Sequence, residues 1–121
     1  MHNPRVQLAE PAVAHYLRFV NRHGPLDPRS QRKLLREARN GDGDALDHVF
    51  KATRPLMVEL ARQQYAGGLE FMDLVAEGSV ALIMAIREYD EESHGPFDIH
   101  VIRRVRLALE TAEAEAERRA S

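Results

Sequence analysis

The sequence predicts an all-α protein, a compact bundle of about five helices. Apolar residues recur at helical spacing along most of the chain, and no segment alternates polar and apolar residues as a half-buried strand would. The prolines and glycines lie between the periodic segments, where they would break helices. The 121 residues contain no cysteine, so we expect one domain that folds around an apolar core without disulfides or thiolate metal sites.

The first two helices are predicted on either side of the segment "HGPLDP". One covers about Pro11 to His23, and its apolar residues fall on one face. The other follows Asp27, a good N-cap residue, with Pro28 at the first helical position. The segment "NGDGD" ends this helix, and either Asp42 or Asp44 is expected to cap the next one.

The third segment, "ALDHVFKATRPLMVELARQQYA", contains Pro55, which removes one backbone hydrogen bond and predicts a kink or two abutting helices. Gly67 and Gly68 are expected to end it. A fourth helix is predicted from about Glu70 to Tyr89, with Gly78 inside it. Its expected core residues are Leu74, Val75, Val80, Leu82, Ala85, Ile86 and Tyr89.

The last helix follows the loop "DEESHGP" and is predicted to begin at a cap, Asp98, and to reach about Arg118. Its expected apolar stripe consists of Ile99, Ile102, Val105, Leu109 and Ala112. Residues 110–121 are rich in alanine and glutamate and have little to bury. We therefore expect this helical tail to fray.

The composition argues against several classes of protein. The longest apolar runs are too short to span a membrane, and the N-terminus lacks the apolar stretch of a secretory signal, so a cytoplasmic location is expected. The net charge of −2 gives no overall attraction to nucleic acid. Charge is nevertheless uneven, because "DPRSQRKLLREARN" is basic and "EYDEES" is acidic.

No metal site, cofactor site or catalytic site is predicted. The six histidines include no pair at i, i+4 spacing. The segment beginning at Asp42 resembles a calcium loop, but it lacks the central glycine and has Thr53 where a bidentate glutamate is needed. Because no nucleophile motif or phosphate-binding glycine loop is present either, the protein is not expected to be an enzyme.

One segment, "FMDLVAEGSVALIMAIREYD", resembles the most constant stretch of bacterial RNA polymerase sigma factors of the sigma-70 family. In that family the stretch reads Asp-Leu-Ile-Gln-Glu-Gly, followed by an apolar run and a Phe-Asp ending. The resemblance extends in the same order over about 10–109. Residues 10–40 are similar to the segment before region 2 (region 1.2), and residues 41–109 are similar to region 2.

The resemblance implies a polymerase-binding site on the fourth helix, because this stretch of the family docks on the clamp coiled coil of the largest polymerase subunit. Asp73 and Glu77 match acidic contact residues of the family. Ile83 occupies the position of a methionine and Ser79 that of an asparagine. Ala76 replaces a glutamine, so polar contacts are reduced and docking is expected to be weaker or altered.

The segment "FDIHVIRRVRLAL" falls where the family carries the aromatic residues that melt promoter DNA. His100 replaces a tyrosine, and Arg103 and Arg104 replace two tryptophans. Phe97 and Arg106 match the family, whereas the position of a promoter-recognising glutamine is occupied by leucine. Base–aromatic stacking contributes roughly 1–3 kcal/mol per base, so promoter melting is predicted to be weakened or lost.

Several interpretations of these substitutions remain. The histidine and the arginines would form a basic helix face that binds phosphates of DNA, or a solvated face paired with nearby acids such as Glu110. The chain then acts as one half of a two-part sigma factor, as a competitor for the polymerase clamp, or as a fragment of a longer sigma factor. A second sigma-like subunit or an anti-sigma regulator would be a further partner. The alternatives are a stand-alone DNA-binding module that uses the arginines and a protein–protein interaction module on a sigma-like scaffold.

Overall fold

The structure is a computed structural model that describes residues 26–120, and all regular secondary structure in this range is helical. The predicted all-α bundle is confirmed. The helices are α2 (Pro28–Arg39), α3 (Gly43–Gln64), α4 (Phe71–Glu88), α5 (Glu91–His94) and α6 (Phe97–Ala120). The helix expected at Pro11 to His23 lies outside the described residues.

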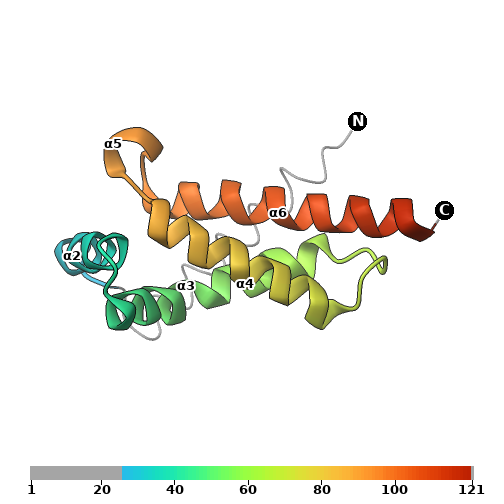
Figure 1. Ribbon diagram of the computed structural model, residues 1–121, viewed down its shortest axis with the longest axis horizontal. Helices are drawn as coiled ribbons and strands as arrows, with labels where there is room; N and C mark the ends of the chain where they lie inside the picture. The colour runs from blue at the N-terminus through green and yellow to red at the C-terminus, as the bar shows by residue number, and fades with distance from the viewer. Residues whose placement is uncertain (1–25, 121) are drawn as a thin grey trace.

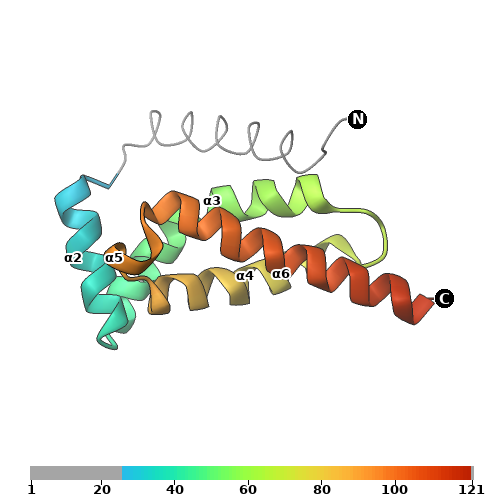
Figure 2. The same cartoon turned by 90° about the horizontal axis from the view of Figure 1, so that it is seen from above.

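Three long helices form the body of the bundle. Figure 1 shows α4 and α6 lying side by side, and α4 also packs against α3. The shorter α2 packs on α3 and α4 at one end, and α5 lies at the same end in both views (Figures 1 and 2). The last turns of α6 lie at the opposite end of the bundle. Side chains along one face of α4 are exposed, so no described helix covers this face.

The predicted helix starts at the N-terminal half are confirmed. Asp27 is the N-cap of α2, where its carboxylate accepts a hydrogen bond from the backbone N–H of Arg29 at 3.5 Å, and Pro28 is at the start of the helix. Asp42, and not Asp44, caps α3. Its carboxylate accepts from the N–H groups two and three residues later at 2.9 and 3.1 Å.

Pro55 lies inside α3, which remains one helix from Gly43 to Gln64. Figure 2 shows that α3 changes direction along its length, in agreement with the expected kink. Two residues of α3 contribute to this bend. The proline cannot donate a backbone hydrogen bond, and the buried hydroxyl of Thr53 donates to the carbonyl of Val49 at 2.8 Å, a contact that tends to bend helices.

The core is formed where α3, α4 and α6 meet. Its largest fully buried side chains are Leu56, Met57, Leu74, Leu82, Ile86, Leu109, Val49, Val101 and Val105. Gly78 lies among them on α4. A Cβ atom at this position would lie 2.9 Å from Sδ of Met57 and 3.4 Å from Cδ2 of Leu109, so a larger residue would force the side chain of Met57 to shift.

For two residues the predicted burial in the core is wrong. Val80 is 57% exposed on α4, and Ile99 is 38% exposed on α6. Helical spacing alone could not place them, because several neighbouring positions on each helix are apolar. The packing partners select Ala81 on α4 and Val101 on α6 for the interior instead.

Helix α6 begins at Phe97 and continues through Ala120, so the tail after Leu109 is helical, and its fraying stays a prediction. Asp98 therefore lies in the first turn and does not cap the helix. Glu113 and Ala116 are buried, and both lie against the loop between α3 and α4. A Cβ atom at Gly68 would lie 3.1 Å from Glu113 Oε2 and 3.6 Å from Ala116 Cβ. The expected loop before α6 contains the short helix α5.

The burial of Glu113 predicts a stabilising substitution. This side chain is only 9% exposed, and its Oε1 atom has no hydrogen-bond partner among residues 26–120. Glu113→Met keeps the length of the side chain and removes the unsatisfied oxygen, so we expect the free energy of unfolding to rise by about 1 kcal/mol. Urea denaturation would measure this change. The exposed Glu115 on the same helix is the control, since Glu115→Met is expected to leave stability unchanged within about 0.5 kcal/mol.

Candidate functional site

The uncovered face of α4 carries two carboxylates. Asp73 and Glu77 are one helical turn apart, and both are exposed. Neither has a hydrogen-bond or ion-pair partner among residues 26–120. Their exposure follows from the packing of α4, because the opposite side of the helix faces the core. The buried residues on that side are Leu74, Gly78, Ala81, Leu82, Ala85 and Ile86. The two carboxylates are therefore available to a partner.

Exposed apolar side chains continue this line along α4. Counted from Asp73 as position i, Val80 and Met84 lie at i+7 and i+11. This spacing keeps them on the same side of the helix as Asp73 and Glu77. Val80 is 57% exposed and Met84 is 46% exposed. We call these four residues the α4 outer face. The sequence analysis did not assign Val80 and Met84 to this face. The helical period that places Asp73 and Glu77 on one side of α4 places these two residues there as well.

The other two predicted polymerase contacts lie at the edge of the α4 outer face. Ser79 and Ile83 are half-buried. The hydroxyl of Ser79 donates to the backbone carbonyl of Val75 at 2.9 Å, so it is already occupied within its own helix. Met72, which is 68% exposed, lies near the start of α4 on the same flank as Ile83. Acidic and apolar groups thus lie together on one side of α4, a combination suited to a protein partner.

The predicted basic face on α6 does not form as expected. His100 is only 7% exposed, and its Nε2 atom lies 3.1 Å from the carbonyl oxygen of Ala85 on α4. Burial is the main cause that lowers the pKa of His100 below its usual value, and the neighbouring His94 also lowers it. A buried, neutral imidazole cannot take part in a phosphate-binding surface in this conformation.

Arg104 points toward α4 as well. Its Nε atom donates to Glu88 Oε1 at 2.7 Å, and its Nη2 atom lies 4.0 Å from the sulfur of Met84. Of the other two arginines, Arg103 is exposed and Arg106 is half-buried. The structure therefore separates the four predicted DNA-binding residues. One is interior, one is bound to the end of α4, and two remain on the surface of α6.

The basic α2 and the acidic segment before α6 lie next to each other. Arg32 Nε is 3.9 Å from Glu91 Oε2, and Arg39 Nη1 is 3.8 Å from Asp90 Oδ1. All four side chains are substantially exposed, so each pair contributes at most about 1 kcal/mol. Part of the positive charge of α2 is nevertheless neutralised within the protein.

Metal-binding clusters and membrane-spanning helices are not found in the described part of the chain. No group of three or more histidine, aspartate or glutamate side chains there is arranged to hold a metal ion. None of the described helices combines the length and the apolar character required to cross a bilayer. With two exposed carboxylates and two exposed apolar side chains, the α4 outer face is the strongest candidate for a functional surface.

Comparison with known proteins gives a consistent set of relatives. The chain is 28% identical to the RNA polymerase sigma factor SigA of Bacillus sp. over 115 residues, which is 95% of this chain and 30% of that protein. It is 30% identical to the RNA polymerase sigma factor RpoS of Coxiella burnetii over 97 residues, 80% of this chain and 28% of that protein. It is also 28% identical to SigA of Clostridium acetobutylicum over 106 residues, 88% of this chain and 28% of that protein.

These comparisons establish similarity to sigma factors along most of the chain. The chain spans less than a third of the length of these curated relatives. It matches no protein-family model.

Proposed function

We propose that this chain is a divergent domain of the sigma-70 family that binds RNA polymerase core and modulates transcription initiation. Residues 41–109 would correspond to region 2, residues 10–40 to the preceding segment, and residues 110–121 to a helical extension. The similarity to three sigma factors over 80% or more of the chain supports the assignment. The protein would act in the cytoplasm as a non-enzymatic factor.

The observation that carries the docking proposal is the exposure of Asp73 and Glu77 on the α4 outer face. These are the two positions at which the family's acidic contact residues occur. The partner surface would be the clamp coiled coil of the largest subunit, with basic groups opposite the two carboxylates. Val80 and Met84 would add apolar contact area, since both are about half-exposed in the free protein.

Ser79 and Ile83 would contribute less than their family counterparts. Both are half-buried, and the hydroxyl of Ser79 is bound within α4. We therefore assign the main part of the binding free energy to the two carboxylates and to the two apolar residues of the α4 outer face.

Promoter melting is expected to be absent or weak. Three aromatic positions of the family are occupied by His100, Arg103 and Arg104. Loss of three stacking platforms removes about 3 kcal/mol or more of binding to flipped bases, which is over two orders of magnitude in the opening equilibrium. The buried position of His100 and the ion pair of Arg104 with Glu88 further reduce the groups that could replace these contacts.

The experiment that tests the proposal measures binding and melting separately. The full chain, labelled with a fluorophore, is titrated with purified bacterial core polymerase, and promoter opening is followed by permanganate oxidation of unpaired thymines. We expect saturable binding, competition by a complete sigma factor, and no permanganate-reactive thymines with this chain alone.

Each result has a distinct meaning. Absence of core binding would overturn the proposed docking function. Open complexes formed by this chain alone would leave docking intact and contradict the loss of melting. If opening appears only when a second sigma-like protein is added, the chain is one half of a two-part sigma factor. If added chain merely suppresses initiation by a complete sigma factor, it is a competitor.

The DNA-binding alternative now rests on fewer residues. Arg103 and Arg106 are the predicted contacts that stay on the surface of α6, and Arg106 is half-buried. Any remaining DNA contact through them would be to phosphates, with an affinity that falls as salt rises.

A further inference from the structure

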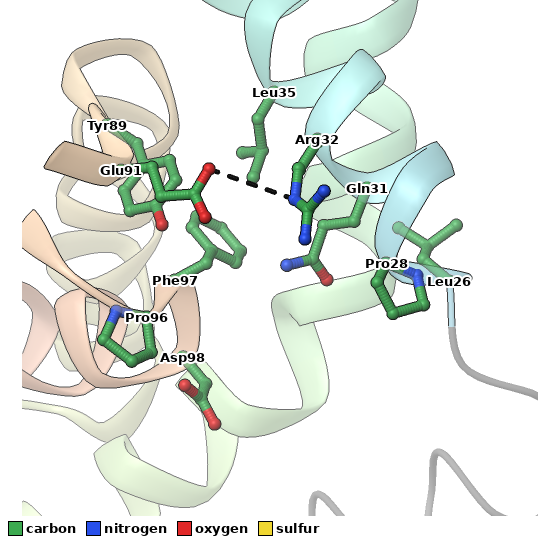
Figure 3. A pocket seen from close by; sticks show the side chains of 10 residues that line it. All are labelled: Leu26, Pro28, Gln31, Arg32, Leu35, Tyr89, Glu91, Pro96, Phe97 and Asp98. Atoms are coloured by element: carbon green, nitrogen blue, oxygen red, sulfur yellow. Dashed lines mark ion pairs between the residues drawn. The ribbon is translucent and has the colours of Figure 1, made fainter.

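The charged side chains near α5 and those on the α4 outer face differ in whether they are already paired. A pocket of about 350 Å³ lies between α2 and the start of α6, and an ion pair between Arg32 and Glu91 lies across it (Figure 3). Asp73 and Glu77 on α4 have no such partner among residues 26–120. Another molecule can therefore satisfy these two carboxylates, whereas the pair at the pocket is satisfied within the protein.

Two arginines close to the α4 outer face are unpaired as well. Arg87 lies at i+14 from Asp73, so it falls on the same side of α4, about 21 Å further along the helix axis. Arg103 lies on α6. Both arginines are exposed, and neither has a hydrogen-bond or ion-pair partner in the described range. One side of α4 thus carries carboxylates near its start and a guanidinium group near its end, with apolar side chains between them.

Helix α6 adds an exposed leucine at the level of this apolar centre. The two helices lie side by side in opposite directions (Figure 1), and Leu109 lies against Gly78. Two residues earlier on α6 therefore corresponds to two residues later on α4, which places Leu107 level with Val80. Leu107 is 60% exposed, close to the 57% of Val80. Two exposed apolar side chains thus lie at one level of the bundle, one on each helix.

The side of α6 that carries this leucine borders the α4 outer face. Arg104 Nη2 lies 4.0 Å from the sulfur of Met84, and Leu107 follows Arg104 by one turn. Arg103 lies four residues before Leu107 and so shares its side of α6. We call the α4 outer face together with Arg87, Arg103 and Leu107 the two-helix face.

The order of groups along α4 is complementary to itself. Val80 is midway between Asp73 and Arg87, so a second copy turned by 180° about an axis at Val80 would lay its α4 antiparallel on the first. Asp73 of each copy then lies opposite Arg87 of the other. Position 76 lies opposite position 84, so the small, exposed Ala76 leaves room for the side chain of Met84 from the second copy.

The side chains of α6 fit the same axis. An axis that crosses both helices places α6 on α6, and Leu107 of both copies then lies near the axis because it is level with Val80. Arg103 is level with about Met84 of its own chain. It therefore comes beside Glu77 of the second copy, which is on the side of α4 nearest α6. Each unpaired carboxylate of the two-helix face gains a guanidinium partner in this arrangement.

We propose that the two-helix face is the interface of a homodimer, with a second copy of this chain as its occupant. An apolar centre with charged groups around it is the usual composition of a specific protein interface. Since the same patch is used on both copies, the contact closes on itself and gives dimers rather than open chains. The dimer covers the α4 outer face, so self-association and polymerase docking exclude each other. The proposal concerns the free chain and does not rest on the polymerase as a partner.

A charge-exchange experiment with the full chain tests the proposed pairing. Asp73→Arg and Arg87→Asp each place like charges opposite each other twice in the homodimer, so each variant alone should self-associate at least about 100-fold more weakly than the parent. An equimolar mixture of the two variants places opposite charges at both contacts. Its association should return to within about tenfold of the parent, as measured by sedimentation velocity from about 1 to about 300 µM.

Matched controls carry the same charge changes elsewhere on the surface. Asp47→Arg on α3 and Arg29→Asp on α2 alter exposed side chains outside the two-helix face, and each should self-associate like the parent. Circular dichroism verifies that every variant stays helical. A parent chain that remains monomeric up to about 300 µM, single variants that associate like the parent, or a mixture no tighter than its components would overturn the proposal. The assay contains no polymerase, so these results leave the docking function to the separate titration with core polymerase.

Discussion

Replacing both Asp73 and Glu77 by lysine should weaken binding of this chain to RNA polymerase core by at least about 100-fold. Placing like charges against each other at an interface costs several kcal/mol, and about 2.7 kcal/mol already corresponds to a factor of 100. The change should not disturb the fold, because both side chains are exposed and have no partner among the described residues. Binding titrations with labelled chain would measure the affinity.

Two controls separate docking from general charge effects. Asp73→Asn with Glu77→Gln removes the charges without reversing them and should give an intermediate loss. Asp47→Lys with Glu115→Lys makes the same change in net charge at exposed positions on α3 and α6. This second control should bind nearly as well as the parent chain. Equal losses in the control and in the charge reversal at Asp73 and Glu77 would show that binding depends on net charge and not on the α4 outer face.

Replacing Gly78 by valine should cost several kcal/mol of folding stability. Its first added carbon would already lie 2.9 Å from Met57 Sδ and 3.4 Å from Leu109 Cδ2. Met57 is fully buried. Inserting extra carbons into a packed core typically costs about 1–3 kcal/mol, and valine adds two methyl groups beyond the Cβ. Urea denaturation followed by circular dichroism would measure the loss.

A double-mutant cycle tests whether the contact with Met57 is the cause. In a Met57→Ala background the space beside Gly78 is larger, so Gly78→Val should cost less by about 1–3 kcal/mol. Ala76→Val, at an exposed position of the same helix, reports the effect of valine on helix propensity alone and should cost less than about 1 kcal/mol. Equal costs of Gly78→Val in both backgrounds would contradict close packing as its role.

The helices themselves were largely predictable because their signals are local. Asp27 with Pro28, and Asp42, are capping residues whose side chains or fixed backbone angle act on the next few residues only. The exposure of Asp73 and Glu77 also followed from the period of α4, since carboxylates without partners remain in water. The similarity to sigma factors was recognisable from the ordered motifs and agrees with the comparisons.

The composition of the surfaces was less predictable, because it depends on neighbouring helices. His100, Arg103 and Arg104 fit one side of an isolated helix, yet α4 supplies a carbonyl for the histidine and a carboxylate for Arg104. Val80 fits a core pattern, yet no described helix covers its side of α4. The tail after Leu109 lacks large apolar groups, yet a glycine loop gives its small residues a surface to pack on.

Helix location, capping and the position of the acidic pair depend on interactions within about one turn of the chain, and the order of residues contains that information. Which side of each helix is interior, which arginine is paired and how much space there is at residue 78 depend on contacts between residues far apart in the chain. Such contacts exist only after α3, α4 and α6 have packed against one another. If one of these helices faced the core one residue further along its sequence, different side chains would be buried and exposed.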